Sequence, residues 1–186
     1  MMQRRSFLSL TAAAAGISAF SALPVRAQTS PNIARASSPV GVLTVEAATD
    51  NDGRPMYSVR RQGRTVVAAS KLGFLLTDAP ALERGLLLTA TQPVAFDETW
   101  EQPWGERRLV RNHYNEFRVT YAETGGLARR FDVVFRLYDD GLGFRYEFPE
   151  QPGLTTARIG SELTEFNLAE NGEALWCPAW EWNREE

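Results

Sequence analysis

The residues best suited to chemistry lie between Phe96 and Phe117, in the stretch FDETWEQPWGERRLVRNHYNEF. It contains two tryptophans, Trp100 and Trp104, and the only histidine of the chain, His113. Five acidic residues and two asparagines, one of them Asn115, lie among these rings. Pyranose rings stack their apolar faces on aromatic side chains, while their hydroxyl groups need paired donors and acceptors. The stretch therefore indicates a carbohydrate-binding surface.

Each of these residues also has a structural interpretation. Trp100 and Trp104 could stack on a sugar or fill a core or an interface. Histidine side chains in general have an unperturbed pKa near neutrality, so a general acid or base role is one interpretation of His113. Glycosidases more often use two carboxylates, so His113 is better interpreted as a hydrogen-bonding residue at a cleft or domain interface, or as an ordinary strand histidine. Asp139 and Asp140 are adjacent carboxylates and could suggest a catalytic pair. They directly precede Gly141, however, and Asp and Gly are the residues that a tight turn favours, so we interpret both as turn residues.

The composition describes one acidic domain. The chain has 186 residues, of which 44% are apolar, and a single cysteine, Cys177. This length is enough for one domain with a sizeable core. The net charge of −3 and the scattered arginines argue against binding to nucleic acid. A lone cysteine cannot form an intrachain disulfide, so Cys177 is expected to be a buried thiol.

Residues 1–27 have the pattern of an export signal of the twin-arginine type. Arg4 and Arg5 precede an Ala/Ser/Gly-rich apolar run, and small residues up to Ala27 favour cleavage there. The alternative is an uncleaved N-terminal anchor, although the run is poor in large aliphatic residues and marginal for a membrane-spanning helix. We therefore expect an exported, periplasmic or extracellular protein that has no membrane contact after cleavage.

The rest of the chain predicts an all-β domain. Residues 28–39 form a Ser/Pro/Ala-rich linker that we expect to be disordered, and the domain is expected to occupy residues 40–186. No segment of the domain keeps a helical period over ten residues, whereas apolar and polar residues alternate between turn signals such as Gln62-Gly63. This pattern is typical of a two-sheet antiparallel β-sandwich. Strands are expected at 42–49, 56–61, 64–69, 72–77, 86–91, 117–121, 131–137, 144–148, 154–160, 163–168 and 174–182.

The end of the chain is rich in aromatic residues. Trp176, Trp180 and Trp182 lie just before the last residue, Glu186. A domain boundary normally falls in an exposed polar linker. We therefore expect that this chain is a truncated part of a longer protein.

Several of these stretches resemble, in the same order, the N-terminal domain of glycoside hydrolase family 97. The resemblance begins with SPVGVLTVEAATDNDGRPMYSV at 38–59 and includes the tryptophan-containing stretch at 96–117. It continues through FRLYDDGLGFRYEFPEQ at 135–151, ELTEFNL at 162–168 and ALWCPAWEWNREE at 174–186. It covers essentially the whole chain after the export signal.

This resemblance implies a role for the domain. Members of the family are exported, calcium-dependent hydrolases of α-glucosides or α-galactosides, with an N-terminal β-sandwich of the supersandwich type, a (β/α)8 barrel and a small C-terminal β domain. The barrel holds most of the catalytic carboxylates, so no catalytic residue is expected in this chain. The N-terminal domain packs on the barrel and supplies a glutamate ligand to calcium, and Glu186 takes that position here.

Three functions therefore stay open. The chain could be the N-terminal part of an α-glycosidase, inactive alone, that contributes Trp100, Trp104, His113 and Asn115 to carbohydrate binding. It could also be a stand-alone carbohydrate-binding module, or a sandwich whose aromatic patch binds another protein. The sequence does not distinguish a glucoside from a galactoside substrate, or a retaining from an inverting mechanism.

Overall fold

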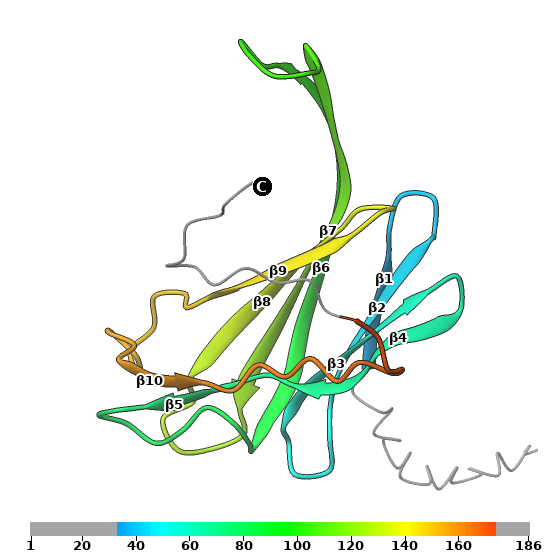
Figure 1. Cartoon of the computed structure of the whole chain (residues 1–186). Coiled ribbons are helices and arrows are strands. Elements are labelled where there is room, and N and C mark those ends of the chain that lie inside the picture. The colour runs from blue at the N-terminus through cyan, green and yellow to red at the C-terminus, as the bar shows by residue number, and fades with distance from the viewer. Residues whose placement is uncertain (1–32, 174–186) are drawn as a thin grey trace, which may run out of the picture.

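The computed structural model describes residues 33–173, in which ten β-strands and no helix are found (Figure 1). Nothing in this described part is therefore a helix that could cross a membrane. The strands are β1 (Ile33–Ser37), β2 (Leu43–Thr49), β3 (Pro55–Arg61), β4 (Arg64–Lys71), β5 (Phe74–Leu76), β6 (Leu86–Glu101), β7 (Leu109–Glu123), β8 (Arg130–Leu137), β9 (Leu142–Glu147) and β10 (Ile159–Glu162).

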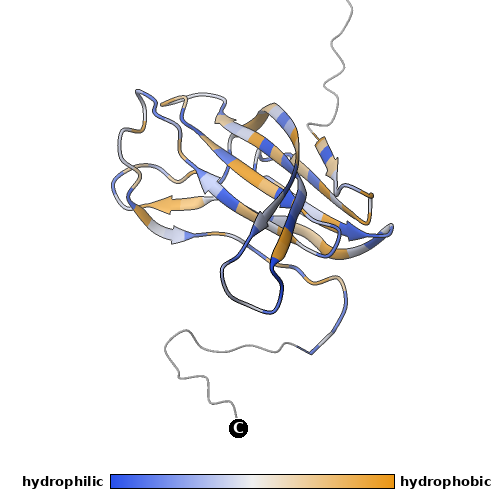
Figure 2. Ribbon diagram, turned by 90° about the horizontal axis from the view of Figure 1, so that it is seen from above, coloured by the Kyte–Doolittle hydropathy of each residue, from blue (hydrophilic) through white to orange (hydrophobic). Residues whose placement is uncertain are grey.

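The strands form two four-stranded sheets in which sequence neighbours pair antiparallel. One sheet has the order β1-β2-β3-β4 and the other β6-β7-β8-β9, while β5 and β10 form a separate pair. Hydrophobic and hydrophilic residues alternate along the strands (Figure 2), as expected when each sheet buries one face. The prediction of an antiparallel all-β domain is confirmed.

Both sheets contribute to one aromatic core. Tyr57 of β3 packs 6.1 Å from Phe135 of β8 and 5.4 Å from Phe144 of β9, measured between ring centroids. The hydroxyl of the fully buried Tyr121 on β7 lies 3.3 Å from the carbonyl oxygens of Ala48 and Met56, in the opposite sheet. Burial raises the pKa of Tyr57 to about 12 and also raises the pKa of Tyr121. Both phenols therefore act as neutral donors: Tyr121 joins the two sheets, whereas the Tyr57 hydroxyl donates a 2.8 Å hydrogen bond to the carbonyl of Glu165.

The predicted turns lie where their residues require them. Gln62 and Gly63 join β3 to β4 with φ angles of 49° and 82°, the left-handed values of a tight hairpin turn. The Asp139 carboxylate accepts a 3.0 Å hydrogen bond from the Val40 amide, and a hydrogen bond with Ser38 lowers its pKa. Asp139 thus joins the β8–β9 turn to the β1–β2 turn, which supports its interpretation as a structural residue.

Two parts of the chain differ from the sequence prediction. Residues 33–37, expected within the linker, form β1, because their backbone pairs with β2 from Ile33–Ala48 to Ser37–Thr44. Composition cannot reveal such a strand, since its order comes from hydrogen bonds to β2 and from the contact of two small residues, Ala34 and Ala36, with the core. The strands expected at 154–160 and 163–168 are largely wrong: only Ile159–Glu162 is a strand, and residues 163–168 run beside β4 with one bridge, Val67–Leu168.

Strands β6 and β7 continue beyond the sheet as a two-stranded arm. Their pairing extends from Leu86–Glu123 to Glu101–Leu109, whereas β8 pairs with β7 only as far as Asn115. Residues 96–114, which we call the hairpin arm, therefore project from the body (Figure 1). The sequence suggested a strand only to residue 91, because the charged residues that follow have no apolar alternation.

A buried ion pair fixes the turn between β7 and β8. The Arg129 side chain is 1% exposed, and two of its nitrogens lie 2.5 and 3.0 Å from the Glu123 carboxylate oxygens. A third nitrogen donates to the carbonyl of Pro80 at 2.8 Å. A charge in a core is tolerated when its donors are satisfied in this way.

We expect Arg129→Met to destabilise the fold by about 3–5 kcal/mol, because it leaves the Glu123 carboxylate partly buried without its cation. The measurement is urea unfolding followed by circular dichroism. Arg64→Met is the matched control, since Arg64 and its partner Glu170 are 73% and 61% exposed and such pairs contribute little. Equal unfolding midpoints for the two variants would contradict the assignment.

The same pair predicts a response to acid. The hydrogen bond from Arg129 lowers the pKa of Glu123 from 4.5. The unfolded chain therefore binds the proton more readily, so this stabilisation is present above that value and is lost as the pH falls through the lower folded pKa. We expect Glu123→Gln to be less stable than the parent near neutral pH and to lose less stability between about pH 7 and about pH 3.5. The measurement is urea unfolding of both proteins at the two pH values. An equal loss of unfolding free energy in Glu123→Gln and in the parent would count against this role.

Candidate functional site

The hairpin arm separates the candidate residues onto two faces. Residues paired directly across an antiparallel ladder point to the same face, and successive residues point to opposite faces. His113 pairs with Asp97, and Trp100 pairs with Val110. Trp100 therefore lies on the face opposite to His113 and Asn115, and the four predicted residues do not form one cluster.

The face that bears Trp100 also holds a stack of aromatic side chains. Tyr114 is 5% exposed and lies 4.9 Å from Phe96 and 5.1 Å from Tyr138, measured between ring centroids. The guanidinium carbon of Arg136 lies 4.8 Å from the centre of the Tyr114 ring, which is within the range of a cation–π contact. This stack supports the root of the arm.

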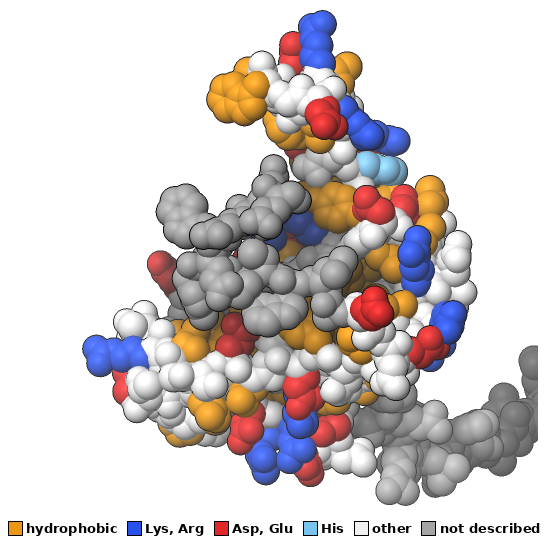
Figure 3. Space-filling model, viewed as in Figure 1, with side chains coloured by type: hydrophobic (Ala, Val, Ile, Leu, Met, Phe, Trp, Pro, Cys, Tyr) orange, Lys and Arg blue, Asp and Glu red, His pale blue; other side chains and the backbone are white. Residues whose placement is uncertain are grey.

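Trp100 and Trp104 are exposed toward the tip of the arm. Their side chains are 45% and 82% exposed, so neither belongs to the core. The arm stands clear of the body, with hydrophobic and charged side chains mixed over its surface (Figure 3). Both tryptophans are therefore accessible to a ligand or to another domain.

The same face of the β6–β9 sheet carries a network of three arginines and three carboxylates. Arg118 binds Asp132 at 2.8 Å and Glu147 at 2.6 Å, and Arg136 binds Glu116 at 2.9 Å. The network is completed by Arg145, whose nitrogens lie 3.7 Å from Glu116 and 2.7 Å from Glu147. Arg118 also lowers the pKa of Glu147. A carboxylate held ionised by arginines is poorly suited to donate a proton to a leaving group, so this network is structural.

His113 lies on the other face, at an open polar recess of about 410 Å³. Arg111 holds Asp97 with two contacts of 2.8 Å, and this pairing lowers the pKa of Asp97. A phenol, an imidazole, guanidinium groups and carboxylates around one recess could bind the hydroxyl groups of a sugar. We call this the arm-base recess; its lining residues are Arg61, Arg111, His113, Tyr138, Asp139 and Asp140.

Asn115 joins two strands from different sheets. Its side-chain nitrogen donates a 2.8 Å hydrogen bond to the carbonyl of Ser37, at the end of β1. This contact holds the base of the arm against the first sheet. Part of the amide is therefore already used within the fold.

The predicted metal ligand lies outside the described residues. Glu186, Cys177 and the whole of 174–186 fall beyond the part of the chain that the structure describes. Within residues 33–173, no group of three His, Cys, Asp or Glu side chains is arranged to hold a metal ion.

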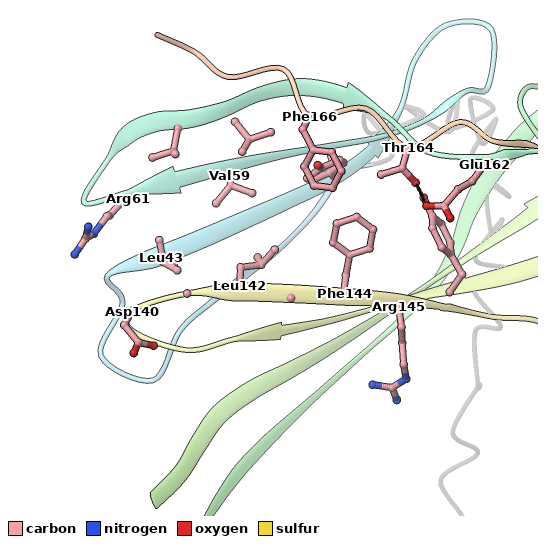
Figure 4. A pocket seen from close by; sticks show the side chains of 16 residues that line it. Leu43, Val59, Arg61, Asp140, Leu142, Phe144, Arg145, Glu162, Thr164 and Phe166 are labelled. Atoms are coloured by element: carbon pink, nitrogen blue, oxygen red, sulfur yellow. Dashed lines mark hydrogen bonds between the residues drawn. The ribbon is translucent and has the colours of Figure 1, made fainter. Parts of the chain in front are cut away.

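The sequence analysis did not identify an apolar groove of about 780 Å³ (Figure 4). Its lining comes from separate segments, including β2, β3, β4 and β9 and the chain at 162–166. No local pattern could predict it, because its lining residues come from segments that are far apart in the sequence. We refer to this feature as the apolar groove.

Comparison with known proteins defines the class. The family described as Glycosyl-hydrolase 97 N-terminal matches residues 36–186. The chain therefore belongs to this family and is the N-terminal domain of a glycoside hydrolase family 97 protein.

The relatives at the sequence level include two α-galactosidases. A probable retaining alpha-galactosidase of Streptomyces bingchenggensis is 30% identical over 183 residues, which cover 96% of this chain and 27% of that protein. A retaining alpha-galactosidase of Bacteroides thetaiotaomicron is 23% identical over 113 residues, or 61% of this chain and 16% of that protein. The chain thus spans about a quarter or less of the curated relatives it matches.

Solved structures agree with this assignment. A family 97 enzyme of Pseudoalteromonas sp. strain K8, in complex with panose, superposes with a TM-score of 0.69 at 35% identity, over 73% of this chain and 20% of that one. The same enzyme is also known in complex with acarbose. A beta-arabinopyranosidase shares the fold, with a TM-score of 0.65 at 24% identity, over 73% of this chain and 21% of that one.

The position of Asn115 leads to a test of its role. Asn115→Ala should lower the free energy of unfolding by about 0.5–1.5 kcal/mol, because the Ser37 carbonyl loses its donor. Gln92→Ala, on an exposed position of β6, is the control and should have little effect. Thermal unfolding of both variants is the measurement. If Asn115→Ala unfolded like the parent, the contact would not stabilise the fold, and a ligand-binding role would become the better interpretation.

Proposed function

We propose that this domain serves an exported α-glycosidase that hydrolyses α-glucosides or α-galactosides. The observation that carries the proposal is the match to the family 97 N-terminal domain over residues 36–186. The names of the relatives, a probable retaining alpha-galactosidase and an enzyme bound to panose, favour α-linked sugars as substrates.

The chemistry of hydrolysis would come from the (β/α)8 barrel. Glycosidases need two carboxyl groups that flank the scissile bond, one of them able to donate a proton. On the face of the β6–β9 sheet, the Asp132, Glu116 and Glu147 carboxylates are each paired with arginine. The domain, completed as a β-sandwich of the supersandwich type, would pack on the barrel and position substrate rather than cleave it.

The hairpin arm is the part of the domain best suited to reach the substrate. Trp100 and Trp104 offer exposed ring faces, and the arm-base recess offers His113 and neighbouring polar groups. A sugar ring could stack on Trp100 or Trp104, and sugar hydroxyl groups could bind at the arm-base recess. Because Asn115 already donates to Ser37, its contribution would be through its remaining amide atoms.

A calcium site would be shared with the barrel. Calcium takes six to eight oxygen ligands, so one carboxylate cannot hold it. By the resemblance, Glu186 supplies one ligand from this chain, and the remaining ligands come from elsewhere in the parent protein. Export by the signal at 1–27, with cleavage after Ala27, would bring the protein to the periplasm or the exterior.

A chimera tests the function. The equivalent N-terminal part of the Streptomyces relative is replaced by residues 28–186 of this chain, and hydrolysis of p-nitrophenyl α-galactoside and α-glucoside is measured. We expect activity that is lost on thorough chelation and restored by calcium but not by magnesium. The relative's catalytic part without any N-terminal domain is the control, and we expect it to be inactive. A folded chimera no more active than this control would contradict the proposal.

The second function, a stand-alone carbohydrate-binding module, is favoured by the exposed tryptophans alone. Calorimetry of the isolated chain with maltotriose and melibiose separates the two. Under the glycosidase proposal, we expect the isolated domain to give weak or no heat, because the barrel would complete the site. Tight binding that Trp104→Ala abolishes would instead establish a binding module.

A further inference from the structure

The apolar groove opens along one side of the domain, between β4 and β9. Phe144 of β9 and Phe166 point toward one another across it (Figure 4), with their ring centroids 6.2 Å apart. Phe166 is nevertheless 65% exposed and Val66 of β4 is 44% exposed. Exposed apolar side chains around a concave surface of this size indicate that something covers it.

The outer edge of β9 also lacks a partner strand among the described residues. β9 is the last strand of its sheet and pairs only with β8. Every second residue of an edge strand directs its amide and carbonyl away from the sheet, so β9 can accept one more strand. An added strand there would lie directly over the groove.

The residues that follow the described chain have the pattern for this position. Residues 163–169 run beside β4, with the Ala169 amide bonded to the Val66 carbonyl at 3.0 Å. Asn171 and Gly172 follow, and both residue types tolerate the backbone angles of a chain reversal. In an extended segment, Trp176, Trp180 and Trp182 would share one face, and Cys177 would lie on the other.

We propose that residues 174–182, ALWCPAWEW, pair with the free edge of β9 and insert their tryptophan side chains into the apolar groove. Large aromatic side chains bury about 150–250 Å² each, which suits an apolar groove of this kind. The family match extends to residue 186, so this segment belongs to the same domain as the groove. That continuity favours the chain's own segment over a second copy or another domain. The inference does not depend on the proposed function.

The geometry of β9 determines the first experiment. Phe144 points into the groove, whereas the Arg145 side chain points away from it (Figure 4). By strand alternation, Gly143 lies on the same outward side as Arg145, where the segment would also place Cys177. A β-carbon added at Gly143 meets nothing within 4 Å, so Gly143→Cys fits without strain. In the full chain, we introduce Gly143→Cys or Arg145→Cys beside the native Cys177, oxidise mildly, and identify linked peptides by mass spectrometry.

We expect an intrachain disulfide with Cys177 at one or both of these positions. Gly125→Cys, in the β7–β8 turn where an added β-carbon also meets nothing within 4 Å, is the control and should not link. Linkage no faster at 143 or 145 than at 125 would overturn the proposal. Disulfides formed only between two chains would overturn it as well, and would show that a second copy occupies the groove.

Hydrogen exchange gives an independent readout. In the full chain carrying Trp176→Ser and Trp180→Ser, amides on the outer edge of β9 should exchange about tenfold faster or more, because they lose their partners. Amides shared by β7 and β8 should stay protected, which shows that the domain remains folded. Unchanged exchange in β9, with the domain folded, would overturn the proposal.

Discussion

The structure depends on the continuous pairing of β6 with β7. At one end of this ladder, Phe117, Val119 and Tyr121 of β7 are buried in the core shared by the two sheets. At the other end, the same strand continues into the hairpin arm, where no other strand within residues 33–173 pairs with it beyond β6. Because one end of β7 is held in the core, the direction of the hairpin arm is fixed relative to the two sheets. The aromatic stack around Tyr114 and the Asn115–Ser37 hydrogen bond strengthen the point where the arm leaves the body.

Many charged residues of the domain are paired with one another within the fold. On the β6–β9 sheet, arginines and carboxylates pair across neighbouring strands and cover the apolar Val134, which is fully buried. Arg129 and Glu123 form a further ion pair, which is buried at the turn between β7 and β8. These ions stabilise the fold and hold carboxylates ionised. The family model identifies the domain as the N-terminal part of a glycoside hydrolase family 97 protein, and the relatives it matches are longer.

Much of the fold could be predicted from the sequence, because alternation and turn chemistry are local signals. The hairpin turns at Gln62-Gly63 and Asp139–Gly141, and the buried face of Phe117, Val119 and Tyr121, were predicted from their residues. Features that depend on contact with a segment far away in the sequence were not predicted. Strand β1 is ordered by pairing with β2, and the chain at 163–168 lies beside β4 without becoming a regular strand. The candidate site was predicted as a cluster in sequence, but strand alternation places Trp100 and His113 on opposite faces.

The most direct test of the central claim is a hydrolysis assay of the isolated chain, residues 28–186, with calcium present. The account predicts no release of p-nitrophenol from α-glucoside or α-galactoside above the rate in buffer, because under the proposed function the acid and nucleophile pair belongs to the barrel. Release that rises in proportion to the concentration of the purified chain, and that disappears when a carboxylate of this chain is replaced by its amide, would contradict it.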